Sequence, residues 1–383
     1  MKILLLADGM NAGGAETHVE TLALGLKARG HETEVFSCGG AIADRLEESG
    51  VAQYRITAVG HSPTRFFAAL AVLRRLIRRG RYDLLHAHTR TAALLARAAV
   101  VGDPRAPVRV VTVHARFRIG RLTRRISDWG DRTVAVSEDL RAYVTDRYRV
   151  PAECVDVIPN GVDTALFCPV PDRRRMGSIL FVSRLDADCS AGADLLCSLA
   201  PRLADAPGLP PVRIRIAGGG SELERLRAAA DNVNRQIGRT TVEIVSLRPQ
   251  DDPPDLVGLY READVFVGVS RAAMEAASAG CAVLLCGNEG YGGRLTSGRA
   301  DAAAGNFCCR DEPPADADRL LSDLLPLLRD PILCRALGRD LRRWMRREFS
   351  SGRMALLTER AYLRAMETPG LRNTSPRDPQ RSS

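Results

Sequence analysis

Short apolar runs alternate with longer amphipathic stretches along most of the chain, and the two patterns have different periods. Apolar runs bounded by turn residues predict buried strands at 2–7, 31–38, 84–88, 110–114, 133–137, 178–182, 212–217, 242–246, 265–269 and 281–285. Apolar positions at helical spacing predict helices at 15–29, 64–79, 138–150, 221–230, 256–263 and 270–280, and further helix from 321 to 366. Strands that alternate with helices are typical of α/β domains with parallel sheets.

The stretch 155–163 interrupts this pattern near the middle of the chain. Val155–Ile158 has the character of the end of a buried strand, and Pro159 stops it because proline has no amide donor. Asn160 and Gly161 both tolerate positive φ, so we expect a sharp turn. Two interpretations stay open: an ordinary surface turn, or a hinge between two domains with a ligand-binding cleft between them.

Length and composition narrow the class of protein. A chain of 383 residues predicts two domains, each with its own core. The first apolar run is too short for a secretory signal, and no run approaches the ~18 apolar residues of a spanning helix. Ten cysteines without a Cys-x-x-Cys pair indicate reduced thiols in a cytosolic protein. The tail 368–383, rich in Pro, Ser and Arg, is expected to be disordered.

Positive charge is concentrated in one segment. The whole chain has a net charge of +9, whereas residues 61–132 hold 16 Arg against 4 acidic residues and carry +12. Such a patch favours an anionic lipid surface, a phosphate-bearing substrate or nucleic acid. Nucleic acid is disfavoured because the arginines of 116–125 have too few aromatic neighbours to stack bases. The arginines near the end of the helix 64–79 either complement the helix dipole or contact a membrane.

The first half carries two kinds of candidate site residue. Gly13 and Gly14 form a strand-to-helix turn that either binds an anion or simply packs the helix on the sheet. His86, His88 and His114 lie at the ends of two predicted parallel strands, where ligands gather in open α/β sheets. A metal triad is disfavoured, because no carboxylate joins these histidines at ligand spacing. We therefore expect no metal.

In the second half the candidates are charged. Gly218–Gly220 resembles a dinucleotide turn, but no acidic residue follows at the expected distance, so we interpret it as helix packing. A helix starts at Ser270 directly after a strand, and its first amides can bind an anion. Glu275, one turn into that helix, is suited to ribose or sugar hydroxyls, with a solvated helix residue as the alternative. The segment 287–293 is a glycine-rich loop at the next strand end.

Several short motifs occur together in one order along residues 1–365. They are Gly13-Gly14-Ala15-Glu16, Thr112-Val113-His114, Ala135-Val136-Ser137, Ile158-Pro159-Asn160-Gly161-Val162-Asp163, Ser183-Arg184-Leu185, Ala263-Asp264-Val265-Phe266-Val267, and Met274-Glu275-Ala276 with Gly280. No single motif is specific, but the ordered set resembles the retaining glycosyltransferases of family four. The resemblance implies the GT-B architecture, in which two Rossmann-like, doubly wound domains face a cleft.

The resemblance also implies a division of labour. We expect an N-terminal acceptor-binding domain at 1–163, a C-terminal nucleotide-sugar-binding domain at 164–345, and a helix at 346–367 that crosses back to the first domain. Arg184 would contact the diphosphate, Glu275 the ribose, and Gly13 and Gly14 the phosphates. His114 would lie near the donor sugar. No metal or other cofactor is implied, because cationic side chains and helix termini neutralise the leaving diphosphate.

Two positions depart from the family pattern. The lysine expected five residues after Arg184 is Cys189, and the glutamate expected eight residues before Glu275 is Val267. Our hypothesis is that Arg271 replaces the lost charge. In the same hypothesis, Asn288 or Glu289 takes over recognition of the sugar.

The function predicted from these residues is sugar transfer from a nucleotide-diphosphate sugar to a glycan or lipid-linked acceptor in cell-envelope or surface-polysaccharide synthesis. The enzyme would be cytoplasmic and peripheral on the inner face of the membrane, with 61–132 docked on anionic lipid. The alternatives are a catalytically silent nucleotide- or glycan-binding partner protein and a related-fold enzyme such as a nucleotide-sugar epimerase.

Overall fold

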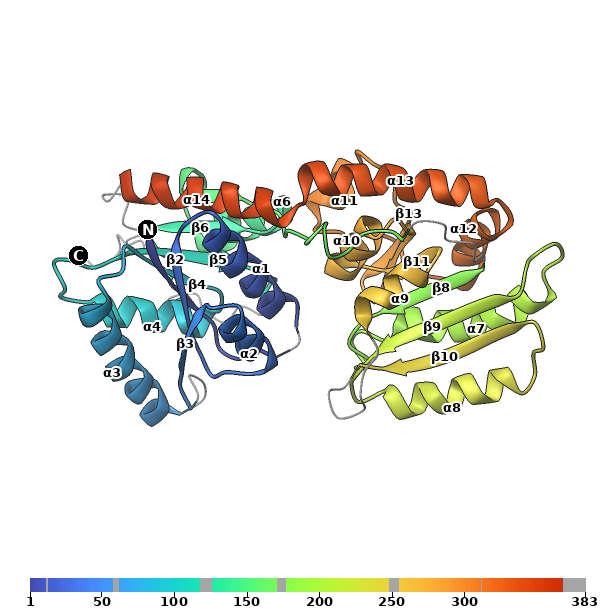
Figure 1. The fold of residues 1–383 in the computed structure, drawn as a ribbon, viewed down its shortest axis with the longest axis horizontal. Helices are drawn as coiled ribbons and strands as arrows, with labels where there is room; N and C mark the ends of the chain where they lie inside the picture. Colours follow the sequence, from blue (N-terminus) through green and yellow to red (C-terminus); the bar gives the residue numbers. More distant parts are fainter. Residues whose placement is uncertain are drawn as a thin grey trace, which may run out of the picture. The chain divides into compact units, whose positions relative to one another are not determined.

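The computed structural model describes residues 1–11, 13–57, 62–117, 126–170, 177–247, 255–310 and 312–367. The chain forms two compact units, one made of Met1–Gly161 with the chain from Ser351 onward, the other of Val162–Ser350. Each unit is built on a single sheet with helices packed against it (Figure 1). The prediction of two α/β layers with parallel sheets is therefore confirmed.

The N-terminal unit contains a seven-stranded sheet in the order β3-β2-β1-β4-β5-β6-β7, and all its pairings are parallel. The strands are β1 (Lys2–Leu6), β2 (Glu32–Ser37), β3 (Ala52–Arg55), β4 (Leu84–Ala87), β5 (Val108–Val113), β6 (Arg132–Ala135) and β7 (Val155–Val157). The order reverses direction beside β1, so the carboxyl ends of β1 and β4 flank a topological switch point, where open α/β sheets bind ligands.

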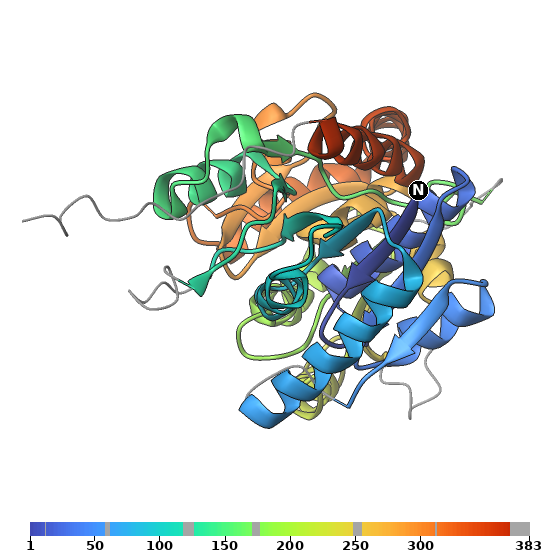
Figure 2. The ribbon, with the colours of Figure 1, turned by 90° about the vertical axis from the view of Figure 1, so that its left-hand side faces the viewer.

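Helices cover both faces of this sheet (Figure 2). They are α1 (Gly14–Ala28), α2 (Ala41–Glu48), α3 (Pro63–Gly80), α4 (Arg90–Val100), α6 (Glu138–Tyr148), the short 3-10 helix η1 (Ala152–Cys154) and α14 (Ser351–Glu367). Along β1, Leu4 and Leu6 enter one apolar core while Ile3 and Leu5 enter the other. Both faces are buried, which explains why β1 is a continuous apolar run rather than an alternating one.

The last described helix, α14, belongs to the N-terminal unit although it lies at the far end of the chain. It packs against α1, where a side chain at Gly25 would come within 2.8 Å of the Ala355 Cβ. The sequence predicted a returning helix at 346–367. Residues 346–348 instead end the preceding helix of the C-terminal unit, and α14 starts at Ser351.

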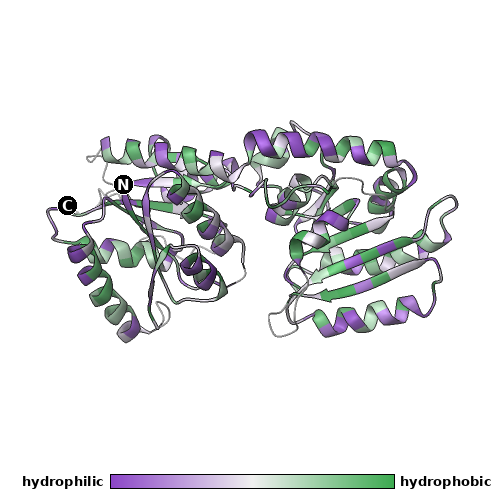
Figure 3. Cartoon of the chain, viewed as in Figure 1, coloured by the Kyte–Doolittle hydropathy of each residue, from purple (hydrophilic) through white to green (hydrophobic). Residues whose placement is uncertain are grey.

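The C-terminal unit contains a six-stranded sheet in the order β10-β9-β8-β11-β12-β13. The strands are β8 (Ser178–Val182), β9 (Val212–Gly218), β10 (Thr240–Ser246), β11 (Val265–Gly268), β12 (Ala282–Gly287) and β13 (Gly290–Arg294). The helices are α7 (Ala191–Asp205), α8 (Leu223–Asn234), α9 (Leu256–Glu262), α10 (Ser270–Ser278), α11 (Ala300–Ala304), α12 (Ala317–Arg329) and α13 (Pro331–Glu348). Figure 3 shows α8 and α13 green on one side and purple on the other, as expected of helices with one buried face.

Two local predictions are wrong. The segment 287–293 was predicted to be a loop, but most of it forms β13, which pairs antiparallel with β12 and buries Tyr291. Asn160 and Gly161 were predicted to form a turn with positive φ, yet neither residue has one. Gly161 instead donates its amide to Met354 Sδ, and Asn160 is a buried residue.

Part of the basic segment, 118–125, and the tail 368–383 lie outside the described residues. Among the helices that the structure describes, none combines the length and the apolar character needed to cross a membrane.

Candidate functional site

Two of the predicted histidines meet at the carboxyl edge of the N-terminal sheet. His88 follows β4 and His114 follows β5, and these strands are parallel neighbours. His88 Nδ1 lies 3.3 Å from His114 Nε2, a distance at which one ring donates a hydrogen bond to the other. The register of the sheet therefore brings them together at the edge where a ligand is expected.

A third histidine, which the sequence did not single out, joins them from α1. His18 is buried, and its ring centroid lies 4.7 Å from that of His114 and 5.4 Å from that of His88. His18 Nδ1 lies 2.8 Å from Asn160 Oδ1, and this contact gives the buried Asn160 a polar partner. The available signal was a histidine next to Val19 on the inward face of α1, since an ionisable side chain is unusual at such a position.

His86 has a different role from the one that the sequence suggested. It lies within β4, with Nδ1 2.7 Å from Tyr362 Oη and Nε2 2.7 Å from Thr112 Oγ1. Both ring nitrogens are therefore engaged, and the first contact ties α14 to the sheet. The group of three that could hold a metal ion is His18, His88 and His114, so the earlier grouping with His86 is wrong.

These imidazoles are neutral at pH 7. Burial, reinforced by the neighbouring histidines, lowers the pKa of His86, His88 and His114 well below the ordinary value. A charged ring would lose its hydration there without gaining a carboxylate partner. This edge of the sheet thus offers hydrogen-bonding nitrogens but no fixed positive charge.

The glycines at the start of α1 are not required by packing. A side chain at Gly14 would meet no described atom within 4 Å, and one at Gly13 would meet only the flexible Glu16 carboxylate. Gly13 has φ −179°, an extended conformation open to any residue. Close approach of a ligand to the first amides of α1 is the remaining physical reason for glycine at these positions.

At the matching edge of the C-terminal sheet, the loop after β8 carries Arg184. Its guanidinium lies 3.4 Å from Asp186, 3.3 Å from Asp188 and 3.3 Å from the sulfur of Cys189, and its side chain is 60% exposed. These contacts are long for charge-assisted hydrogen bonds and exposed to water, so they hold the guanidinium weakly. Arg184 can therefore turn to an anionic ligand at little cost.

The same loop is tied to two other strand ends. Asp186 accepts a hydrogen bond from the Ser221 amide at 2.9 Å, which joins the loop to the glycine turn after β9. Asn288, after β12, accepts from the Ala191 amide at 3.0 Å and donates to Ala187 O at 3.3 Å. Asn288 therefore positions the Arg184 loop. Glu289 lies 3.5 Å from Arg310 in a partly exposed ion pair.

Glu275 is buried rather than solvated. It is 7% exposed, with Oε1 3.0 Å from Arg271 Nε and Oε2 3.1 Å from Tyr260 Oη. Burial raises the pKa of Glu275, although Arg271 and Tyr260 oppose the shift. Tyr260 was not predicted, and only its place in a short helix before β11 could have hinted at it. Arg271 pairs with Glu275, while its proposed contact with a diphosphate stays a prediction.

The start of α10 is conformationally strained. Ser270 has φ 56°, an uncommon value for a residue with a side chain, and its amide donates to Phe307 O at 2.8 Å. Such strain is found at ligand sites more often than elsewhere. Val267, where the family has a further glutamate, is fully buried in β11 and offers no polar contact.

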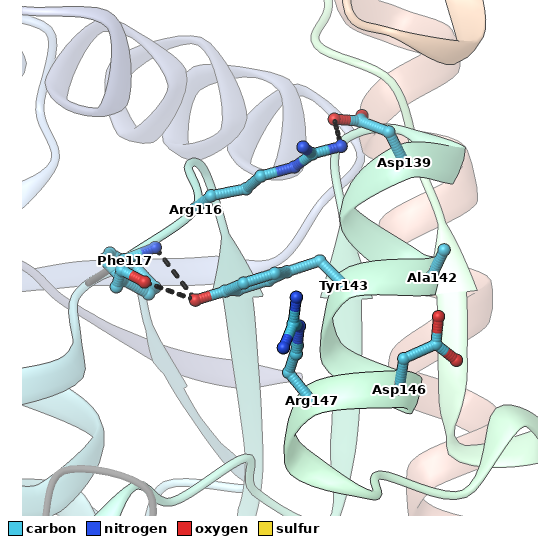
Figure 4. A pocket seen from close by; sticks show the side chains of 7 residues that line it. All are labelled: Arg116, Phe117, Asp139, Ala142, Tyr143, Asp146 and Arg147. Carbon is cyan, nitrogen blue, oxygen red and sulfur yellow. Dashed lines mark hydrogen bonds and ion pairs between the residues drawn. The ribbon is translucent and has the colours of Figure 1, made fainter. Parts of the chain in front are cut away.

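The N-terminal unit also contains a pocket of about 510 Å³ beside the His114 edge. It is lined by Arg116, Phe117, Asp139, Ala142, Tyr143, Asp146 and Arg147 (Figure 4). Tyr143 Oη accepts from the Phe117 amide at 3.0 Å and donates to the Phe117 carbonyl at 2.8 Å. The pocket therefore joins an aromatic ring, two guanidiniums and two carboxylates, groups that bind polyhydroxylated or phosphorylated ligands.

The two halves of the chain match two models of one enzyme family. Residues 12–166 match Glycosyltransferase Family 4, and residues 177–330 match Glycosyl transferases group 1. The chain belongs to the family 4 glycosyltransferases. These enzymes move a sugar from a nucleotide-sugar donor, and the predicted resemblance is confirmed.

Individual relatives are distant. The chain is 28% identical over 236 residues to the human (Homo sapiens) catalogue of one component of phosphatidylinositol N-acetylglucosaminyltransferase, a match that covers 57% of this chain and 48% of the human protein. It is 25% identical over 340 residues to D-inositol 3-phosphate glycosyltransferase of Arthrobacter sp., covering 76% and 77%. The chain thus spans about half the length of the human relative and most of the bacterial one.

Solved structures establish the fold. A glycosyltransferase from Rickettsia africae superposes with a TM-score of 0.75 at 17% identity, over 96% of this chain and 98% of that one. Anabaena HepE in complex with UDP superposes with a TM-score of 0.70 at 16% identity, over 95% and 100%. The GT-B fold predicted from the sequence is therefore confirmed.

Proposed function

We propose that this enzyme transfers a sugar, with retention of anomeric configuration, from a nucleotide-diphosphate sugar held by the C-terminal unit. The observation that carries the proposal is the buried Glu275, whose carboxylate is oriented by Tyr260 and Arg271 at the start of α10. A carboxylate kept away from water is costly unless a ligand uses it. Ribose hydroxyls, which donate hydrogen bonds, supply that use.

Arg184 is proposed to hold the diphosphate. Breaking the bond between sugar and diphosphate builds negative charge on the leaving oxygen, and a guanidinium stabilises that charge as it grows. The weak contacts of Arg184 with Asp186 and Asp188 are easily exchanged for phosphate oxygens. The leaving phosphate takes the proton of the acceptor hydroxyl, so no strong general base is needed. His114, neutral in this structure, is proposed to donate to or accept from a hydroxyl of the donor sugar.

The acceptor is proposed to be a phosphate-bearing or lipid-linked glycan or polyol used in envelope or surface-polysaccharide synthesis. The names of the human and Arthrobacter relatives include phosphatidylinositol and inositol 3-phosphate. The pocket near Arg116 and Arg147 has the chemistry for such a ligand, because guanidiniums suit phosphate and the Tyr143 face suits a ring. This pocket is our candidate acceptor site.

Membrane docking is proposed through α3. Its outward face carries Phe67, which is 65% exposed, and Val72, which is 47% exposed, beside exposed Arg75, Arg78 and Arg79. Apolar and cationic side chains on one exposed face favour an anionic interface. Vesicles with anionic lipid should bind the protein at low salt and release it at high salt. Replacing the three arginines by serine should abolish binding, whereas the same change at exposed Arg335, Arg339 and Arg346 of α13 should not.

Donor hydrolysis is the direct test of the main proposal. A panel of nucleotide sugars is incubated with the protein, and release of nucleoside diphosphate is measured with and without acceptor candidates. We expect slow hydrolysis of one donor that is lost in Arg184→Ala. Arg213→Ala is the matched control, because Arg213 is similarly exposed and pairs with Glu243 on β10. Stabilisation by a nucleoside diphosphate with no turnover of any donor would instead support the silent binding protein.

A further inference from the structure

Three histidines from separate elements converge at the carboxyl edge of the N-terminal sheet. His18 comes from α1, His88 follows β4 and His114 follows β5. Each ring offers one nitrogen, and the three nitrogens lie within 4.8 Å of one another. The elements that hold the rings are fixed by a parallel sheet and a packed helix, so the group is preorganised.

The spacing is close to that of ligands on one metal ion. Two nitrogens bound to tetrahedral zinc at about 2.0–2.1 Å lie about 3.4 Å apart. His88 Nδ1 and His114 Nε2 are 3.3 Å apart. The ring centroids lie 4.7, 5.4 and 5.6 Å from one another, which leaves all three rings directed around one point. A small adjustment of His18 would complete the set.

The protonation states suit a metal as well. Burial lowers the pKa of His88 and His114, so these rings need not lose a proton to bind. His18 Nδ1 is held by Asn160 Oδ1, which leaves Nε2 as its ligand atom and supplies the outer hydrogen bond that metal-bound histidines usually have.

One polar atom of the group is unexplained by the protein alone. His88 Nε2 is buried and has no hydrogen-bond partner among the described residues. Because Nδ1 faces His114, the His88 ring cannot turn to satisfy one nitrogen without giving up the contact of the other. An unpaired buried nitrogen costs about 1–3 kcal/mol. That cost indicates that something other than the described side chains is accommodated here.

We propose that His18, His88 and His114 form a binding site for a divalent transition metal, with Zn²⁺ as the reference ion and at least one coordination position open. Three imidazoles without a carboxylate favour zinc, copper, nickel or cobalt over magnesium or calcium. The metal occupies a nitrogen of His114. If His114 contacts the donor sugar, as the proposed function holds, the metal inhibits transfer rather than assisting it.

Cobalt reports such a site directly. Co²⁺ is titrated into the metal-free full-length protein, and the visible absorption of the bound ion is followed. We expect one saturable equivalent with the weak bands of nitrogen ligation and without the strong near-ultraviolet bands of thiolate, which the ten cysteines would give. His18→Gln and His88→Gln should each weaken binding by at least about tenfold.

His31→Gln is the matched control. His31 belongs to the same unit, lies 3.0 Å from Glu359 and is remote from the cluster in the contacts that it makes. It should bind Co²⁺ as the wild type does. The proposal is overturned if the wild type takes up no stoichiometric Co²⁺. It is also overturned if both cluster variants, folded by circular dichroism, bind Co²⁺ like the wild type.

Activity separates this proposal from the one on function. Zn²⁺ should inhibit donor hydrolysis in the wild type and in His31→Gln, and a chelator should restore it. Binding of Co²⁺ without inhibition by Zn²⁺ would keep the metal site and remove the proposed role of His114. Normal hydrolysis in a protein that binds no Co²⁺ would remove the metal site and leave the proposed function intact.

Discussion

The two sheets present chemically different edges from closely related topologies. In the N-terminal unit, the carboxyl edge carries neutral, buried imidazoles with no described carboxylate in their group. In the C-terminal unit it carries Arg184 with exposed acidic neighbours and a buried Glu275 paired with Arg271. The same strand–helix repeat thus builds one edge for hydroxyl and imidazole chemistry and another for charge.

This difference indicates how each unit accommodates its functional groups. The charged edge keeps its guanidinium in water, where a loose ion pair costs little and can be exchanged for a ligand. The neutral edge keeps its histidines out of water, where a charge is expensive, and so avoids attracting the diphosphate to the wrong side. Substitutions on both edges test this contrast.

Arg184→Ala should have the largest effect. Loss of the guanidinium removes the stabilisation of the leaving diphosphate, and we expect kcat/KM to fall about 10²- to 10³-fold. Arg184→Lys should recover part of the loss, because the charge returns without the planar fork. Measured with the donor found in the panel, an Arg184→Ala enzyme within threefold of the wild type would show that the charged edge does not bind the diphosphate.

Gly14→Val tests the neutral edge. Because a side chain at Gly14 meets no described atom, the melting temperature should change little while kcat/KM falls about tenfold or more through blocked ligand approach.

Gly338→Ala is the inverse control for this prediction. Its side chain would overlap the Gly280 carbonyl where α13 packs on α10, so stability should fall by about 1–3 kcal/mol, with kcat retained in the folded fraction. Thermal melting and steady-state kinetics on both variants check the pair. Unchanged kinetics in Gly14→Val would remove Gly14 from the ligand site.

The sequence predicted the repeat well and the side-chain partners poorly. Apolar runs such as 2–7 are buried on both faces of parallel sheets, so their pattern is strong and local. The partners of Glu275 and His88 depend on which strands are neighbours, which no local pattern records. Tyr260 reaches Glu275 from a different helix, and His18 reaches His88 from α1.

The Asn160-Gly161 pair shows how a local rule fails for a physical reason. The dipeptide favours a turn with positive φ, but here the Asn160 side chain is worth more as a partner for His18 Nδ1 than as a turn former. The segment 287–293 fails in the same way. Its glycines indicate a loop, yet the burial of Tyr291 pairs it with β12 as an edge strand.

Glu275 supplies a pH test of the charged edge. Burial raises its pKa in the folded protein, so its contribution to stability is full below the ordinary value of the unfolded chain and is lost as pH rises through the folded value. Ribose hydroxyls donate to the ionised form, so nucleotide binding releases a proton and affinity rises with pH in that window. Calorimetry in buffers of different ionisation enthalpy measures the proton.

Glu275→Gln is the reference for that measurement, since the phosphates titrate equally in both proteins. The variant should bind nucleotide about tenfold more weakly and lose the extra pH dependence. If both proteins show one and the same pH profile, Glu275 does not contact the ribose, and the buried carboxylate serves the Arg271 and Tyr260 contacts alone.

Cys189→Lys should have the smallest effect, and it sharpens the contrast by adding charge where the family has lysine. The Cys189 sulfur lies 3.3 Å from Arg184 Nη2, so a lysine there would extend past the guanidinium toward the ligand side of the loop. Asp186 and Asp188 accommodate the second cation, which limits the gain. We expect nucleoside-diphosphate affinity to rise roughly fivefold, ~1 kcal/mol, measured by calorimetry. Cys189→Ser, which removes the thiol without adding charge, should bind as the wild type does. Unchanged affinity in Cys189→Lys would mean that Arg184 alone already saturates the diphosphate, so the missing lysine is a change of design rather than a loss.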